Sequence, residues 1–284
     1  MFRRLILISS IIALFLTNYS CHETETQHVA FNWWDSLQHT EADSIALRPL
    51  LQELTAFLSK RCIDSNTTSY LIIDDTEENP VILAEFHSNQ LLIPASVQKI
   101  LITGAALEIL GDKAKRDIHI CNLQSHNSLA NKLLKNIGKE VYGSRSYSNG
   151  IRAVLGFWET KGVDMTGAQM ADGSGRRYDN FLSAHQLVDI LSYQTTAPTF
   201  GAFYSSLPLA GISGTLRHTL NGTIAEGKIR AKTGTLAAVK TLAGYGSTVS
   251  GRKLIFAIIV NNYTCRNSTL KKMMEHMLVE MIKL

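Results

Sequence analysis

Short apolar runs bounded by polar or glycine-containing turns predict strands near both ends of the chain. These runs cover residues 69–73, 81–86, 228–231, 239–248 and 253–261. The polar segment between the first two runs predicts a hairpin, and helical patterns occupy most of the chain from 94 to about 192. Strands at both ends with helices between them predict an α+β fold, in which an antiparallel sheet is flanked by helices and joined to a helical lobe.

One amphipathic helix is predicted before the first strand and another after the last. The first has Leu50, Leu51, Leu54, Phe57 and Leu58 at helical spacing, with Pro49 in its first turn. The second carries an apolar stripe of Leu270, Met273, Met274, Met277, Leu278 and Met281, and Asn267 or Ser268 can cap it. We expect both helices to pack on the sheet. Without an internal repeat or boundary, residues 48–284 are predicted to form a single domain.

Residues 1–21 have the layout of an export signal. A short basic segment with Arg3 and Arg4 is followed by an apolar run from Leu5 to Leu16 and a polar stretch that ends at Cys21. The apolar run is shorter than the roughly 20 residues that a membrane-spanning helix needs. Both a signal peptide and a lipoprotein signal with lipidation of Cys21 remain open. Residues 22–47 are predicted to be a linker or N-terminal arm, and the mature chain is expected in the periplasm or cell envelope, held at the membrane only by a possible lipid anchor.

Composition narrows the possible partners. The net charge is +4 without a basic run or an aromatic-basic stripe, which argues against a nucleic-acid partner. The four cysteines form no C-x-x-C pair and the nine histidines no H-E-x-x-H motif, so we expect no metal and no cofactor. We expect a monomer.

The first chemical motif is Ser96-Val97-Gln98-Lys99, at the start of the helix that Pro94 introduces. Residues three apart lie on one face of a helix, so the Lys99 amine can reach the Ser96 oxygen. Burial and a second nearby cation would lower the pKa of Lys99 and make it a usable base for a Ser96 nucleophile. The motif is weak by itself, because a capped helix can carry the same residues.

Two further motifs complete the candidate site. Ser125-His126-Asn127 offers a hydroxyl that can relay a proton and an amide that can orient a substrate carbonyl. Lys232-Thr233-Gly234, continued by Thr235, is predicted to lie on a strand, directly after residues 228–231. There Lys232 can meet a substrate carboxylate, Gly234 lets a ligand lie along the strand, and the N–H of Thr235 can complete an oxyanion hole.

In this order, the three motifs resemble the active-site set of penicillin-binding proteins and serine β-lactamases. Segments 94–99, 172–175, 207–216 and 230–236 are similar to the type-4, low-molecular-mass D-Ala-D-Ala carboxypeptidase/endopeptidase family, and the resemblance covers about residues 48–265. It implies a β-lactamase/transpeptidase-like fold and a serine carboxypeptidase. Ser96 would be acylated by a peptidoglycan stem peptide or a β-lactam, with Lys99, Ser125 and Lys232 as catalytic residues. Asn127, Thr233, Gly234 and Thr235 would bind the substrate.

One departure from the family concerns the spacing of the first two motifs. Family members carry large accessory domains there, but Ser96 and Ser125 are only 29 residues apart, so both accessory domains are expected to be absent. Two other functions therefore stay open. One is a peptidoglycan-binding or β-lactam-binding module without turnover. The other is a serine β-lactamase, either of class A, although no E-x-x-L-N occurs, or of the class C type, with Tyr147-Ser148-Asn149 replacing the second motif.

The resemblance also implies that the first and last strands are antiparallel neighbours. That pairing would bring Cys62, before the first strand, close to Cys265, after the last. We therefore predict a disulfide between Cys62 and Cys265, provided that their Cα atoms lie within about 7 Å of each other.

Overall fold

The five predicted strands form one antiparallel sheet in the computed structural model, which describes residues 41–284. The strands are β1 (Thr68–Asp74), β2 (Val81–Phe86), β3 (Ile229–Leu236), β4 (Val239–Ser247) and β5 (Lys253–Asn261). Their order across the sheet is β2-β1-β5-β4-β3, and the register of β1 and β5 pairs Thr68 with Val260. The antiparallel sheet and the pairing of the first with the last strand are therefore confirmed, and β3 is left as an edge strand.

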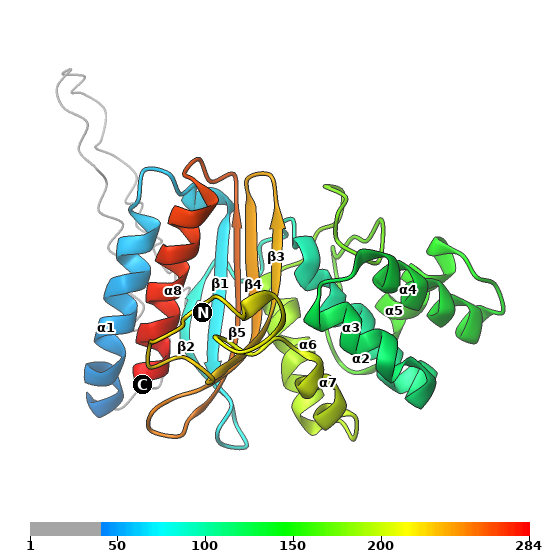
Figure 1. Cartoon of the computed structure of the whole chain (residues 1–284), viewed down its shortest axis with the longest axis horizontal. Coiled ribbons are helices and arrows are strands. Elements are labelled where there is room, and N and C mark those ends of the chain that lie inside the picture. Colours follow the sequence, from blue (N-terminus) through cyan, green and yellow to red (C-terminus); the bar gives the residue numbers. More distant parts are fainter. Residues whose placement is uncertain (1–40) are drawn as a thin grey trace, which may run out of the picture. The chain divides into compact units, whose positions relative to one another are not determined.

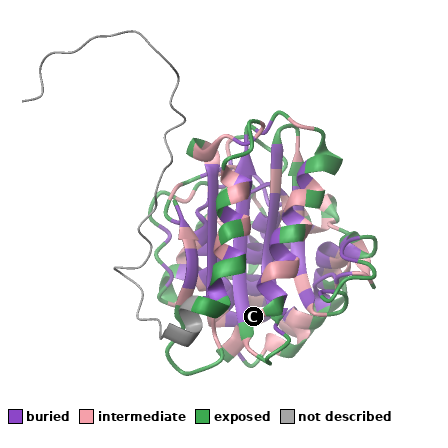
Figure 2. Cartoon of the chain, turned by 90° about the vertical axis from the view of Figure 1, so that its left-hand side faces the viewer, coloured by how far each residue is buried: buried purple, intermediate pink, exposed green. Residues whose placement is uncertain are grey.

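Helices cover both faces of this sheet. They are α1 (Glu41–Leu58), α2 (Lys99–Leu110), α3 (Lys115–Leu123), α4 (Asn127–Tyr142), α5 (Tyr147–Thr160), α6 (Ala184–Thr196), α7 (Phe200–Ser206) and α8 (Asn267–Lys283). Figure 1 shows α1 and α8 side by side against one face, with α2 to α7 on the other side. Viewed from the α1 and α8 side, the outer surfaces of these helices are exposed and the strands behind them are buried (Figure 2). Among the helices within residues 41–284, none is long and apolar enough to cross a membrane.

Helix α1 begins earlier than the hydrophobic pattern predicts. It starts at Glu41, so Pro49 lies inside the helix and not in its first turn. Leu47 is buried together with Leu50 and Leu54, which extends the core-facing stripe toward the N-terminus. Burial of Leu47 helps to offset the backbone hydrogen bond that an internal proline removes. The predicted end of the N-terminal arm at residue 47 is therefore wrong, whereas the predicted export signal at 1–21 lies outside the described residues.

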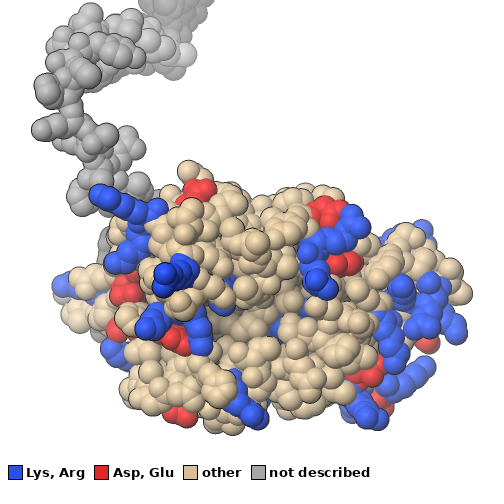
Figure 3. All heavy atoms as spheres, turned by 45° about the horizontal axis from the view of Figure 1, so that its top comes forward, with Lys and Arg blue, Asp and Glu red and all other residues tan. Residues whose placement is uncertain are grey.

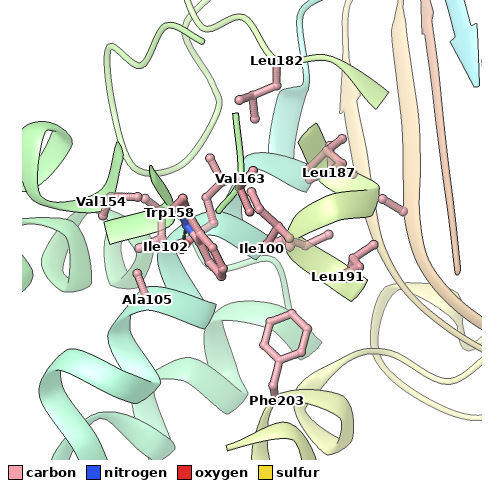
Figure 4. Packing of buried hydrophobic residues seen from close by; sticks show 14 of the residues in the cluster. Ile100, Ile102, Ala105, Val154, Trp158, Val163, Leu182, Leu187, Leu191 and Phe203 are labelled. Carbon is pink, nitrogen blue, oxygen red and sulfur yellow. Dashed lines mark hydrogen bonds between the residues drawn. The ribbon is translucent and has the colours of Figure 1, made fainter. Parts of the chain in front are cut away.

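Helix α2 is the centre of the helical lobe. Ile100, Leu101 and Ile102 are all buried, so the helix is covered on every side, as expected for an apolar helix without a polar face. Figure 4 shows Trp158 of α5 lying against this helix, and its indole Nε1 donates a hydrogen bond to the Leu101 carbonyl at 3.2 Å. A Cβ on Gly104 would lie 2.9 Å from the Trp158 ring. This close packing gives Lys99, the first residue of α2, a rigid support.

The predicted disulfide between Cys62 and Cys265 is not formed. Both residues are free cysteines in the structure. Their side chains are nevertheless neighbours, because a hydrogen bond from Cys62 is one of the causes that raise the pKa of Cys265, after burial. Backbone pairing supports the same proximity, since the Thr264 N–H donates to the Cys62 carbonyl at 3.0 Å. Strand pairing thus brings the two thiols together, but the covalent bond is absent.

Candidate active site

Ser96 and Lys99 meet at the N-terminal end of α2. Ser96 belongs to a 3-10 turn, η3 (Ala95–Gln98), and Lys99 begins the α-helix. The Lys99 Nζ lies 2.7 Å from the Ser96 Oγ, so the predicted contact is present. The preceding residue, Ala95, has a φ of +47°, a left-handed conformation that is unfavourable for a residue with a Cβ. Strain of this kind persists only where surrounding contacts hold the backbone, as at many functional sites.

Lys99 is completely buried and is surrounded by oxygen acceptors. Its Nζ donates to the Asn127 Oδ1 at 2.9 Å and to the Ser174 carbonyl at 2.6 Å. Burial, as the largest cause, lowers the pKa of Lys99 to about 8, and Arg176 also lowers it while Cys121 and Asp172 act in the opposite direction. In its neutral form the amine can donate to the two fixed acceptors, and its lone pair then points toward the Ser96 hydroxyl. The arrangement is that of a general base for Ser96.

The loop of residues 172–175 supplies a contact that the sequence did not reveal. The sequence marks residues 172–175 only as a segment similar to the family, but the main-chain carbonyl of Ser174 is one of the acceptors of Lys99. Asp172 holds that carbonyl in place, because its Oδ1 accepts from the N–H groups of Ser174 at 2.9 Å and Gly175 at 2.6 Å. The loop is also tied to α4, where Asn131 accepts a hydrogen bond from the Gly173 N–H at 2.8 Å. Every residue has a main-chain carbonyl, so the residue type of Ser174 does not identify it as an acceptor. In the sequence, only the similarity of segment 172–175 to the family pointed to this loop.

Ser125 and Lys232 form a second serine–lysine pair in the same site. The Lys232 Nζ donates to the Ser125 Oγ at 2.9 Å and to the Thr233 carbonyl at 2.9 Å. Ser125 has a φ of +56° and lies between α3 and α4, so its hydroxyl is presented by a strained turn. Lys232 is completely buried, and burial followed by the charge of Lys99 lowers the pKa of Lys232 to about 7.

Strand β3 lies directly against the turn that carries Ser96. A Cβ on Gly234 would lie 2.9 Å from the Ser96 nitrogen and only 2.1 Å from the Thr241 Oγ1, so glycine is required at this position. Thr241 of β4 also donates to the Pro94 carbonyl at 2.8 Å, which ties the sheet to η3. The N–H groups of Ser96 and Thr235 therefore belong to adjoining segments, as the two donors of an oxyanion hole would.

Thr233 and Thr235, two of the remaining predicted binding residues, line one pocket beside β3. Thr233 donates from its hydroxyl to the Thr215 Oγ1 at 2.7 Å, and the Thr235 Oγ1 accepts from the Lys240 Nζ at 3.2 Å. Thr215 belongs to segment 207–216, which resembles the family, but it was given no role, and Lys240 lies outside every motif and family-like segment singled out from the sequence. Thr215 belongs to a short 3-10 turn, η5 (Gly214–Leu216), and Lys240 is opposite Thr235 in the register of β3 and β4.

Tyr147 does not share in this cluster. It lies at the start of α5, with the Lys135 Nζ 4.2 Å from the centre of its ring. It lines a separate pocket together with Lys132, Lys135 and Arg145. Figure 3 shows positively charged side chains gathered on the right of the molecule, the side on which α4 and α5 lie in Figure 1. Because Ser125 faces Lys232 directly, the geometry favours Ser125 over Tyr147 as the second hydroxyl.

The connection between the first two motifs is short. Only α2, the 3-10 turn η4 (Gly111–Ala114) and α3 lie between Ser96 and Ser125. Within the part of the chain that the structure describes, no group of three or more His, Cys, Asp or Glu side chains is arranged to hold a metal ion. The site therefore combines Ser96 with the Lys99 amine, which can lose its proton, and Ser125 with the Lys232 amine. The N–H groups of Ser96 and Thr235 lie on adjoining segments beside these pairs. This set suits acyl transfer.

Comparison with known sequences agrees with this chemistry. The sequence profile of the D-Ala-D-Ala carboxypeptidase 3 (S13) family matches residues 116–282, a range that includes Ser125 and Lys232 but begins after Ser96 and Lys99. The D-alanyl-D-alanine carboxypeptidase of Actinomadura sp. (strain R39) is 37% identical over 145 residues, which cover 49% of this chain and 27% of that protein. Carboxypeptidase DacB of Mycolicibacterium smegmatis is 35% identical over 145 residues, covering 49% and 32%. The chain thus spans less than a third of the length of these relatives.

Solved structures share the fold. Penicillin binding protein 4 (dacB) from Haemophilus influenzae superposes with a TM-score of 0.57 at 23% identity, covering 60% of this chain and 41% of that one. The TLA-1 extended-spectrum β-lactamase superposes with a TM-score of 0.65 at 13% identity, covering 84% of this chain and 98% of that one. At these identities the likeness concerns the fold alone. The predicted β-lactamase/transpeptidase-like fold is confirmed.

Proposed function

The chain belongs to the D-Ala-D-Ala carboxypeptidase 3 (S13) family. From this premise we propose that it is a serine carboxypeptidase that removes the terminal D-Ala from peptidoglycan stem peptides through an acyl-enzyme at Ser96. The observation that carries the proposal is the meeting of two serine–lysine pairs, Ser96 with Lys99 at 2.7 Å and Ser125 with Lys232 at 2.9 Å. Both lysines are completely buried, so each can lose its proton near neutral pH.

Acylation begins with the Ser96 hydroxyl and the neutral Lys99 amine. Lys99 takes the proton from Ser96 while the Ser96 Oγ forms a bond to the carbonyl carbon of the penultimate D-Ala. The negative charge that develops on the carbonyl oxygen is stabilised by the N–H groups of Ser96 and Thr235. Asn127, which already accepts from Lys99, has an amide NH₂ group that can donate to a carbonyl of the substrate.

The leaving group receives its proton through the second pair. When the peptide C–N bond breaks, Ser125 donates its proton to the departing D-Ala nitrogen and takes a replacement from the Lys232 ammonium. Water then attacks the ester and returns a proton to Lys232 through Ser125, while Lys99 returns its proton to the Ser96 Oγ. Each lysine finishes the cycle in the protonation state in which it began.

Several finer features belong to the same proposal. A β-lactam would acylate Ser96 in place of the peptide, because its strained amide can occupy the same oxyanion hole. Export to the periplasm or cell envelope is supported by the signal-like pattern of residues 1–21, with Cys21 as a possible lipid attachment point. We propose that the protein acts as a monomer.

The proposal is tested with purified protein lacking residues 1–21 and its Ser96→Ala variant. Both are incubated with a fluorescent penicillin and, separately, with a peptide that ends in D-Ala-D-Ala. The proposal expects a stable covalent label and D-Ala release, both lost in Ser96→Ala by about 10⁴-fold or more. Rapid hydrolytic loss of the label without D-Ala release would identify a β-lactamase. A folded wild-type protein that neither labels nor releases D-Ala would contradict the enzyme and favour the binding module.

A further inference from the structure

The main chain of the 172–175 loop lies between the two elements whose side chains contact Lys99. The loop itself contributes the Ser174 carbonyl, which accepts from the Lys99 Nζ at 2.6 Å. On one side it is bonded to η3, and on the other to α4, which also supplies Asn127 as the second acceptor of Lys99. A Cβ on Gly173 would lie 2.7 Å from a main-chain carbonyl oxygen of α4, so the loop approaches this helix very closely. The position of the Ser174 carbonyl therefore depends on how the loop is held between η3 and α4.

One peptide unit of this loop is held from two sides. Its carbonyl, that of Asp172, accepts a hydrogen bond from the Gln98 Nε2. Its N–H, that of Gly173, donates to the Asn131 Oδ1 at 2.8 Å. The C=O and N–H of a trans peptide point in opposite directions, so two bonds of this kind fix the plane of the peptide.

The Asp172 carboxylate extends this support to the next two peptides. Its Oδ1 accepts from the N–H groups of Ser174 at 2.9 Å and Gly175 at 2.6 Å. The Gly175 N–H belongs to the same peptide as the Ser174 carbonyl. Three successive peptides are thus held in order, and a movement of the first is passed on to the acceptor of Lys99.

Gln98 is an unusual residue for the closely packed start of α2. It is completely buried, and its Oε1 has no hydrogen-bond partner among the described residues. An unsatisfied amide oxygen is unfavourable in the interior, and a methionine of similar size would avoid it. Departures of this kind are expected where function requires them. The group that Gln98 contributes is the amide N–H that reaches the Asp172 carbonyl.

Resting on the proposed role of Lys99 as the base for Ser96, we propose that Gln98 and Asn131 are positioning residues of this reaction. Together they hold the peptide between residues 172 and 173 and thereby direct the Ser174 carbonyl at Lys99. With that acceptor in place, the neutral amine donates to Ser174, and its lone pair faces the Ser96 hydroxyl. Gln98 and Asn131 themselves take part in no bond-making step.

The test uses substitutions that remove one hydrogen bond and keep the approximate size of the side chain. Gln98→Met removes the donor to the Asp172 carbonyl, Asn131→Leu removes the acceptor of the loop N–H, and Asn131→Asp keeps an acceptor oxygen. The free energy of unfolding should change little in Gln98→Met, because one unsatisfied oxygen replaces another. The matched control is Gln194→Met in α6. Gln194 is also a completely buried glutamine, and its amide has no partner among the described residues.

The first measurement is the rate of acylation by the fluorescent penicillin. Gln98→Met and Asn131→Leu should each lower the second-order rate constant about 10- to 100-fold, because a displaced carbonyl lets the Lys99 amine turn away from Ser96. The double variant should be little slower than the slower single variant, since both substitutions act on one peptide. Asn131→Asp and Gln194→Met should stay within about 3-fold of wild type.

The second measurement is the pKa of Lys99, obtained by NMR titration of protein with isotope-labelled lysine side chains. Gln98→Met and Asn131→Leu should lower this pKa from about 8 to about 7, since the ammonium loses a carbonyl that stabilises its charge. A residue that only supports the fold would not move it. Both variants leave in place the charged and titratable groups that interact electrostatically with Lys99, which are Cys121, Asp172, Arg176 and Lys232.

Three results would overturn the inference. An unchanged acylation rate and an unchanged Lys99 pKa in Gln98→Met and Asn131→Leu would mean that the loop holds its carbonyl without them. A slower reaction that follows a loss of stability, with the Lys99 pKa unmoved, would mean that the two residues only support the fold. Fully additive losses in the double variant would mean that they do not act on the same peptide.

Failure of the proposed function is recognised separately. The wild type would then neither bind penicillin covalently nor release D-Ala, and the Lys99 pKa in the variants would decide the inference by itself. If Gln98→Met does not fold, the comparison of Asn131→Leu with Asn131→Asp decides it, because only the first of these removes the hydrogen bond to the loop.

Discussion

The two serine–lysine pairs of the active site have nearly the same geometry but different origins. Ser96 and Lys99 are three residues apart and meet at 2.7 Å within one turn. Ser125 and Lys232 are 107 residues apart and meet at 2.9 Å only because β3 docks beside the turn between α3 and α4. Both lysines are completely buried. The same chemical unit is thus built once by local backbone geometry and once by packing of the sheet against the helical lobe.

This difference suggests a division of labour. The local pair keeps its contact whenever η3 and α2 are formed, which suits a nucleophile and its base. The long-range pair exists only when the two lobes are assembled, which suits a proton path to a substrate that lies between them. The predictions below test this division, from the largest expected effect to the smallest.

The largest effect is expected from changing the leaving group in variants of the two pairs. Lys99→Met should lower kcat/KM about 10³-fold or more on both an amide and a thioester substrate, because Ser96 loses its base in either case. Ser125→Ala should lose about 10²- to 10³-fold on the amide but far less on the thioester, since a thiolate departs without a proton. Steady-state kinetics with matched peptide and thioester substrates provide the measurement. If kcat/KM recovered on the thioester to the same extent in Lys99→Met and in Ser125→Ala, the two pairs would not have separate roles.

A second, smaller effect concerns the contact between β3 and η3. Gly234→Ala would place a Cβ against the Thr241 hydroxyl and the Ser96 nitrogen. The resulting shift should lower kcat/KM about 10²-fold by misplacing the oxyanion donors, and overpacking should lower the free energy of unfolding by about 1–3 kcal/mol. Kinetics and urea denaturation measure the two quantities.

Gly156→Ala is the matched control for that variant. Gly156 lies in α5, where a Cβ would have no neighbour within 4 Å. Activity should be unchanged, and alanine should raise the free energy of unfolding by up to about 1 kcal/mol, because it is the better helix former. Similar losses of activity in both variants would contradict the proposed close contact at Gly234.

The smallest effect is the dependence of acylation on pH. Burial disfavours the charged lysines, with pKa values of about 8 for Lys99 and about 7 for Lys232, so the amine fraction grows as pH rises through this range. Because the proposed cycle needs a neutral Lys99 and a charged Lys232, kcat/KM should be bell-shaped, with its maximum between pH 7 and pH 8 and values about 5- to 10-fold lower at pH 6 and pH 9. The two groups titrate as a pair, so the profile reports their combined behaviour. A flat profile between pH 6 and pH 9, with the protein folded throughout, would exclude Lys99 as the base and Lys232 as the proton source.

Much of the fold could be predicted because most strands carry short, largely apolar runs bounded by polar or glycine-containing turns. The order of the elements and the family resemblance then implied the sheet in which β1 pairs with β5. The start of α1 was missed, because Pro49 is a stronger local signal than the single apolar residue Leu47 that extends the buried stripe. The disulfide between Cys62 and Cys265 was wrongly predicted, since strand pairing determines proximity but not oxidation.

The sequence alone determined the contact between Ser96 and Lys99, because helical geometry places residues three apart on one face whatever surrounds them. Only the tertiary structure decided that Ser125 and not Tyr147 meets Lys232, that the Ser174 carbonyl holds Lys99, and that Lys240 lies beside Thr235. These contacts join segments far apart in the chain, or groups such as a carbonyl that every residue has. Their formation depends on how the sheet packs against the helical lobe, and no spacing within one segment encodes that packing.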